Sequence, residues 1–156
     1  MMFLGWIAVA FTDGPRKWDV PGVVFTATHQ DSFVRRAQPC AIELTMKNTT
    51  DKTFRIMLAG FWPNHRIILR DQAGQPPDLT EHGRLCVSVF SPGGPRDKNA
   101  PHDILPGKTY TYKTPDLAKV YQLRPGRYTV EVVYEEIVEG KRDRISSSPF
   151  DLTVQD

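Results

Sequence analysis

The sequence has little excess of either charge. It carries 20 Lys and Arg residues against 18 Asp and Glu residues, for a formal net charge of +2 at pH 7. A domain that binds nucleic acid usually shows a clustered basic stripe and a larger positive excess. The basic pairs Arg35-Arg36 and Lys141-Arg142 are too short to form such a stripe and are interpreted as solvated surface. We therefore expect no nucleic-acid partner.

Cysteine is also scarce, with Cys40 and Cys86 as the two cysteines of the chain. Cys40 falls on the same alternate positions as Ile42, Leu44 and Met46, which predicts that it faces the core. A disulfide would require Cys86 to lie opposite Cys40, and sequence spacing does not establish this. We expect two free, buried thiols.

No apolar run in the chain is long enough to cross a bilayer. The first eleven residues are apolar, whereas a spanning helix needs about 20 apolar residues. Ala8-Val9-Ala10 has the form of a signal-peptidase site, but no basic region precedes it. For residues 1–21, an extra β-strand, an apolar hook that docks on a partner or membrane, and the remnant of a leader peptide all remain open. None of the three makes this an integral membrane protein, and peripheral membrane contact stays open.

Signatures of common enzymes are missing as well. There is no Gly-x-Ser-x-Gly, no phosphate-binding Gly-rich loop and no His-Glu-x-x-His. The histidines His29, His65, His82 and His102 are far apart in the chain. Loops could gather His102 with His65 or His82 around a metal, but scattered surface histidines are far commoner. We expect no catalytic residue, no metal site and no cofactor.

Two short motifs could be functional or plain surface. Glu135 and Glu136 are adjacent, and adjacent residues of a strand face opposite sides, so we expect them on the surface and not around one substrate. Asn48-Thr49-Thr50 matches the N-glycosylation pattern. In a turn between two strands, Asn48 would be accessible to modification.

What the chain does have is frequent turns between short alternating segments. Thirteen prolines and eleven glycines lie between apolar runs, which is typical of an all-β fold. In the clearest segment, the Pro125-Gly126 turn leads into 128–134, where Tyr128 and alternate residues after it are apolar. The other predicted strands are 23–29, 39–47, 53–58, 66–70, 85–90, 108–113 and 148–154.

One short helical turn is predicted between two of these strands. Thr114 would cap it, Pro115 and Asp116 would occupy its first turn, and it would end near Val120. The stretch 91–103 is too polar and too rich in Pro and Gly for regular structure. Seven or eight short strands at this spacing indicate a two-sheet antiparallel sandwich that forms a single domain over residues 22–156.

Three segments resemble immunoglobulin-like and fibronectin type III-like domains of the bacterial accessory type. Leu-x-Pro-Gly-x-Tyr-x-Val-x-Val at 123–132 is similar to their penultimate strand, 39–48 to the second strand, and Ser-Ser-Pro-Phe-x-Leu-x-Val at 147–154 to the closing strand. The resemblance implies an immunoglobulin-like sandwich in which the Tyr128 hydroxyl reaches back to the preceding loop. With the leader-like N-terminus, it also implies an extracytoplasmic location, periplasmic or secreted.

Aromatic side chains supply the candidates for a binding surface. Six residues are candidates: Phe61, Trp62, Pro63, His65, Trp6 and Trp18. Phe61 and Trp62 could form an exposed ledge for a sugar or a protein, or they could cap the core of the sandwich.

The sequence therefore predicts a non-enzymatic β-sandwich that serves as a binding or accessory subunit. Loops 59–65 and 91–107 and the apolar N-terminus would contact a protein partner or a larger complex. An alternative is a secreted carbohydrate-binding or protease-inhibitor domain, based on the aromatic loop and the Pro/Gly-rich loop. A third is a small metal-dependent enzyme that uses the loop histidines.

Overall fold

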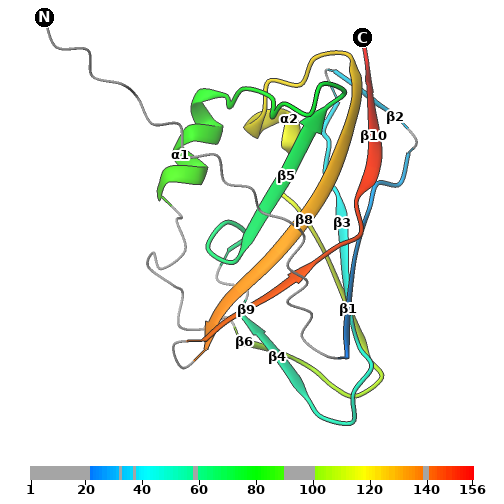
Figure 1. Cartoon of the computed structure of the whole chain (residues 1–156), viewed down its shortest axis with the longest axis vertical. Helices are drawn as coiled ribbons and strands as arrows, with labels where there is room; N and C mark the ends of the chain where they lie inside the picture. Colours follow the sequence, from blue (N-terminus) through cyan, green and yellow to red (C-terminus); the bar gives the residue numbers. More distant parts are fainter. Residues whose placement is uncertain (1–21, 32, 37, 58–59, 90–100, 139–140) are drawn as a thin grey trace, which may run out of the picture.

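The computed structural model describes residues 22–31, 33–36, 38–57, 60–89, 101–138 and 141–156. Within them the chain is mostly β, with ten strands and two short helices (Figure 1). The strands are β1 (Val23–Thr28), β2 (Phe33–Arg35), β3 (Glu43–Asn48), β4 (Phe54–Met57), β5 (His65–Asp71), β6 (Pro101–Ile104), β7 (Thr109–Lys113), β8 (Gly126–Val138), β9 (Lys141–Ser146) and β10 (Phe150–Gln155). The helices are α1 (Glu81–Val89) and α2 (Leu117–Val120). The predicted all-β class is confirmed, and the interpretations of residues 1–21, with Trp6 and Trp18, lie outside the described residues.

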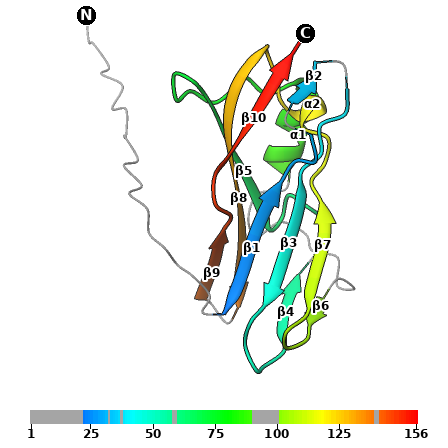
Figure 2. The same cartoon turned by 90° about the vertical axis from the view of Figure 1, so that its right-hand side faces the viewer.

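The strands form three hydrogen-bonded sheets. One has the order β1-β3-β7, the second has the order β2-β10-β8-β5 with β9 also paired to β8, and the third is β4-β6. Figure 2 shows the first two sheets as facing layers, with β4 and β6 at the end far from α2. β2 runs parallel to β10, and the other pairings are antiparallel. The sequence predicts two antiparallel sheets with seven or eight strands and one helical turn. The described residues instead form three sheets with one parallel pairing, ten strands and two helices.

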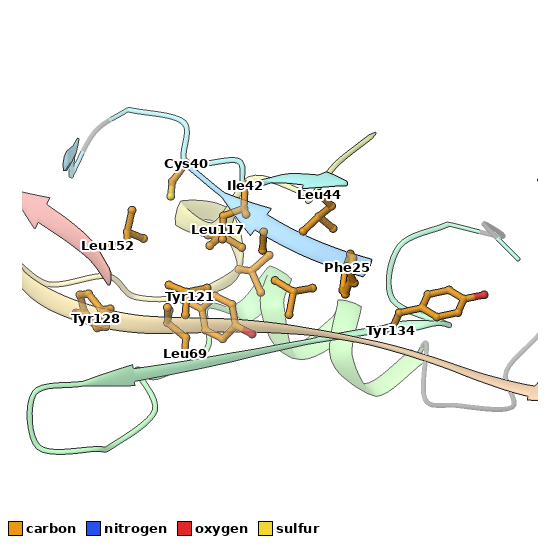
Figure 3. Packing of buried hydrophobic residues seen from close by; sticks show 14 of the residues in the cluster. Phe25, Cys40, Ile42, Leu44, Leu69, Leu117, Tyr121, Tyr128, Tyr134 and Leu152 are labelled. Carbon is orange, nitrogen blue, oxygen red and sulfur yellow. The ribbon is translucent and has the colours of Figure 1, made fainter. Parts of the chain in front are cut away.

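The core lies between the two larger sheets. Tyr128, Val130, Val132 and Tyr134 of β8 are buried, as their alternation predicts. Other members come from both sheets and from α2, among them Phe25, Ile42, Leu44, Leu69, Leu117, Tyr121 and Leu152 (Figure 3). Full burial of one large aliphatic side chain contributes roughly 1.5–3 kcal/mol. The layers are thus held together mainly by side chains that are distant in sequence.

A helix replaces the strand predicted at 85–90. α1 begins after Thr80, whose hydroxyl accepts a hydrogen bond from the Gly83 N–H at 2.9 Å, as an N-cap does. Leu85 and Val87 are 59% and 43% exposed, so the apolar run is not the inward face of a strand. A short apolar run does not distinguish a strand from a helix. Here the Thr80 cap and the packing of Gly83 favour the helix.

The two cysteines are free thiols, as predicted. Cys40 is fully buried, and burial, with a smaller effect of the Asp116 charge, raises the pKa of its thiol to about 11. Cys86 is only half-buried, because it lies on α1 at the surface and not on a strand, so the prediction of burial is wrong for this residue.

Two further elements differ in detail from the prediction. β6 lies at the end of the stretch expected to be irregular, where it pairs with β4. The predicted short helix is present as α2, but Asp116 caps it by accepting a hydrogen bond from the Ala118 N–H at 3.1 Å. The Thr114 hydroxyl instead accepts the Ile42 N–H at 2.9 Å, which ties the start of this connection to the residue before β3.

Both glutamates expected at the surface are buried. Glu135 is covered by Arg66 of β5 and by Arg144 of β9, both of which contact its carboxylate. Glu136 accepts a hydrogen bond from the Tyr134 hydroxyl at 2.7 Å. The surface interpretation is wrong because β8 is covered on both faces in its second half, a consequence of packing that alternation alone does not reveal.

Asn48 is also fully buried, which contradicts the glycosylation interpretation. Its amide nitrogen donates to the carbonyl oxygens of Lys52 and Ile104 at 2.7 and 2.8 Å. Its amide oxygen accepts the Thr50 N–H at 3.0 Å. The amide is therefore used to close the turn after β3 and is not available to a glycosyltransferase.

Candidate binding cleft

An open cleft of about 270 Å³ lies at one end of the molecule. Figures 1 and 2 both place β2, α1, α2 and the end of β10 at this end. Its lining residues are Arg36, Thr80, Ala118, Tyr121, Gln122, Leu123 and Arg124. They come from three segments: the residue after β2, the N-cap of α1, and α2 with its connection to β8. We call this the Arg36–Arg124 cleft.

Arg36 and Arg124 give the cleft its charge. Both residues are exposed, and within the described part of the chain neither guanidinium group forms a hydrogen bond or an ion pair. No acid, histidine or cysteine is among the lining residues. A guanidinium group presents its N–H donors in a fixed planar fork that matches an oxyanion. The cleft is therefore suited to hold a negatively charged group.

The backbone of Arg124 is held by the buried side chain of Tyr128. The Tyr128 hydroxyl donates to the Arg124 carbonyl oxygen at 2.9 Å and accepts the Arg124 N–H at 3.0 Å. Gly126 has φ of +150°, which an L-residue rarely adopts, and with Pro125 it turns the chain into β8. One wall of the cleft is thus fixed by the strand that forms the centre of the core.

The other walls of the cleft are also held in place by hydrogen bonds. Arg36 donates its N–H to the Gln155 carbonyl oxygen at 2.8 Å. Gln122 donates its backbone N–H to the Asp78 carbonyl oxygen at 2.8 Å and its side-chain amide to the Leu79 carbonyl oxygen at 3.2 Å. Three segments of the chain are therefore held together around the cleft by internal hydrogen bonds. A preformed site of this kind lowers the entropic cost of binding in general.

The neutral hydroxyl groups of the cleft also have internal partners. The Thr80 hydroxyl donates to the Lys119 carbonyl oxygen, and the Tyr121 hydroxyl donates to the Ile67 carbonyl oxygen at 3.3 Å. Burial raises the pKa of Tyr121 to about 12, so its hydroxyl stays neutral at physiological pH. The arrangement offers binding groups but no activated nucleophile or general base.

Replacing Tyr128 by Phe is expected to lower the free energy of unfolding by about 1–3 kcal/mol, because the partly buried N–H and C=O of Arg124 lose their partner. Urea denaturation would measure the loss. Tyr110→Phe is the matched control, since within the described residues the Tyr110 hydroxyl has no hydrogen-bond partner. Equal stability of the two variants would contradict the role given to Tyr128.

The aromatic loop selected from the sequence lies outside this cleft. Phe61 and Trp62 are half-buried and pack against the core, and Pro63 and His65 are buried. Phe61 stacks on the His65 ring with centroids 4.4 Å apart, and Trp62 meets Phe61 edge-on at 5.1 Å. The loop thus has the core-capping arrangement, which was one of the two interpretations of the sequence.

His65 is the centre of a buried polar network. Its Nδ1–H donates to the Phe61 carbonyl oxygen at 2.8 Å, so Nε2 accepts from the Tyr112 hydroxyl at 2.7 Å. Burial lowers the pKa of His65 to about 4, although the bond to Phe61 opposes the shift. Burial also raises the pKa values of Tyr112 and Tyr134. These groups are neutral partners of one another and have structural roles.

The remaining histidines are dispersed. His82 lies 3.4 Å from the Cys86 sulfur on α1 (Nε2 to Sγ), His102 packs on the Tyr110 ring, and His29 bonds to the Asp31 carbonyl oxygen. Among the described residues, no group of three or more His, Cys, Asp or Glu side chains could hold a metal. Nor does this part of the chain contain a helix long and apolar enough to span a membrane.

Sequence reasoning missed the cleft. The sequence indicates Arg36 only as half of a solvated basic pair, and Arg124 precedes the Pro125-Gly126 turn with no predicted role of its own. Neither residue belongs to a motif, and the parallel pairing of β2 with β10 brings Arg36 to this end of the molecule. Compared with known proteins, the chain matches no family model and no curated sequence.

Proposed function

We propose that this chain is a non-enzymatic immunoglobulin-like module that binds a protein partner as an accessory subunit. The single observation that carries the proposal is the Arg36–Arg124 cleft, in which two guanidinium groups without a partner among the described residues lie on a preformed surface. The end of the fold that carries this cleft would form the contact. An acidic feature of the partner would supply the missing negative charge.

The order of the strands supports the immunoglobulin-like assignment. In such domains the first, second and fifth strands (A, B and E) share one sheet, and the third, sixth and seventh (C, F and G) share the other. Here β1, β3 and β7 correspond to the first set, and β5, β8 and β10 to the second. The Tyr128 hydroxyl bond to Arg124 corresponds to the tyrosine corner of the sixth strand. The β4-β6 sheet and α1 are departures from the pattern.

The state of the titratable groups supports a binding role over catalysis. A catalytic acid or base must reach the substrate from a cleft. His65, Glu135 and Glu136 are buried and have internal partners. The residues that line the Arg36–Arg124 cleft can hold a negative charge in place, and no carboxylate, imidazole or thiol is among them.

Charge reversal of the cleft is expected to release the partner. In extracts of the producing cells, the wild-type chain should migrate in native size separation as a complex larger than the 17.7 kDa monomer. The double variant Arg36→Glu/Arg124→Glu should lose at least about tenfold in affinity for that partner, since it replaces attraction by like-charge repulsion.

The matched control is Arg35→Glu/Arg127→Glu. It makes the same change in net charge at exposed arginines beside the cleft that do not line it. The control should remain in the complex. A wild-type chain that migrates as a free monomer in every cell fraction would refute the proposed function, as would equal release of both double variants.

A further inference from the structure

The hydrogen-bond donors that line the Arg36–Arg124 cleft indicate which chemical group it would bind. We infer that the cleft binds the carboxylate of an acidic side chain, carried by a partner polypeptide. The inference rests on the proposed binding function and specifies its chemistry. It follows from three observations on the lining residues: the charge, the donors that remain free, and the size of the cleft.

The free donors of the cleft are almost all guanidinium N–H groups. The hydroxyl hydrogens of Thr80 and Tyr121 are already donated to backbone carbonyl oxygens. The side-chain amide of Gln122 donates to the Leu79 carbonyl oxygen. A ligand oxyanion would therefore meet the two planar forks of Arg36 and Arg124, with little from other donors. Two forks can bind both oxygens of a carboxylate, and the apolar surface beside them would match the aliphatic stem that an acidic side chain has and a phosphate ion lacks.

Size and polarity point to a side chain as the source. The cleft volume of about 270 Å³ is below the usual range for sites that enclose whole small molecules. Ala118 and Leu123 add apolar surface beside the two charged groups. An Asp or Glu side chain combines a carboxylate with a short aliphatic stem, so both kinds of surface would be matched.

The experiment is an NMR titration of the purified full chain that observes the arginine Nε–Hε signals. The probes are N-acetyl-glutamate N-methylamide, its neutral glutamine analogue, and inorganic phosphate. The glutamate probe should shift the signals of Arg36 and Arg124 in a saturable manner, with a Kd on the order of 1–10 mM for an isolated charged group. The glutamine analogue should shift neither signal.

Two double variants test whether the glutamate probe binds at Arg36 and Arg124. Arg36→Gln/Arg124→Gln should raise the Kd at least about tenfold, and Arg35→Gln/Arg127→Gln should leave it unchanged; retained backbone spectra show that both variants fold. Phosphate binding as tight as glutamate binding would overturn the carboxylate assignment. So would the absence of any shift, or unsaturated shifts spread over all exposed arginines.

The outcomes separate this inference from the proposed function. If charge reversal releases a partner but the glutamate probe does not bind, the carboxylate assignment fails and the binding function stands. If the probe binds and no partner complex exists, the proposed accessory role fails instead.

Discussion

Acidification from pH 6.5 to pH 4 is expected to destabilise the protein through His65. Burial holds the pKa of His65 at about 4 in the folded state, against an ordinary value of 6.5. Between these values the unfolded chain binds a proton that the folded chain does not, so the free energy of unfolding falls as the pH falls. The loss is complete below pH 4 and amounts to roughly 3 kcal/mol. Above pH 6.5 the histidine is neutral in both states and adds no pH dependence.

The surroundings of His65 explain why protonation of its ring is unfavourable in the folded state. Protonation would place a hydrogen on Nε2, where the ring now accepts the Tyr112 hydroxyl hydrogen. The hydroxyl would have to turn away inside a buried site, and the new charge would be desolvated.

The measurement is urea denaturation at a series of pH values. His65→Gln should be less stable than wild type at pH 7 and should lose most of the slope between pH 4 and pH 6.5. His29→Gln is the control, because His29 is not buried and hydrogen-bonds within its own turn. A wild-type slope in His65→Gln would show that another group causes the acid sensitivity.

Replacing Gly83 by Ala is expected to destabilise the protein, although Ala is the better helix former. In an exposed helix interior this change gains about 1 kcal/mol. Here a Cβ atom would lie 2.0 Å from the Val120 carbonyl oxygen and 2.9 Å from its carbonyl carbon. The end of a flexible side chain could move aside, but these are backbone atoms of α2 and cannot. The helix α1 must therefore move away from α2. We expect a net loss of about 3 kcal/mol, as for a severe overpacking change.

Gly83→Ala should also change the structure near α1, in addition to lowering the free energy of unfolding. Leu79 and Thr80, which precede α1, contact the segment 119–122, so displacement of α1 would open the Arg36–Arg124 cleft. Denaturation curves and backbone NMR shifts near α1 and α2 would test this. Val87→Ala, at an exposed site of the same helix, should have little effect. A Gly83→Ala protein as stable as wild type would disprove the close packing of the two helices.

The central strands were predictable because their signal is local. In β10, and over residues 44–46 of β3 and 128–134 of β8, every second side chain is apolar, and a strand places such residues on one face whatever its neighbours are. The Pro125-Gly126 turn and the short helix before it were equally local, since cap and turn residues act on their own backbone.

The errors arose where packing overrides local preference. The run of Leu85, Cys86 and Val87 suits a strand or a helix, and the contact of Gly83 with Val120 selects the helix. Asn48 and Glu135 are polar and were expected outside, but partners from other strands satisfy them inside. A polar residue can be buried once it is paired, and pairing between distant segments is invisible to a local pattern.

By itself, the sequence determined an all-β chain with an inward face on its main strands, because alternation and turn chemistry depend on near neighbours. Tertiary structure alone decided the three-sheet pairing, the parallel contact of β2 with β10, and the cleft. Arg36 and Arg124 lie far apart in the chain and share no motif. They line one cleft because hydrogen bonds to Gln155 and Tyr128 fix their backbones at the same end of the fold. Such convergence is set by the packing of whole layers, which no short segment encodes.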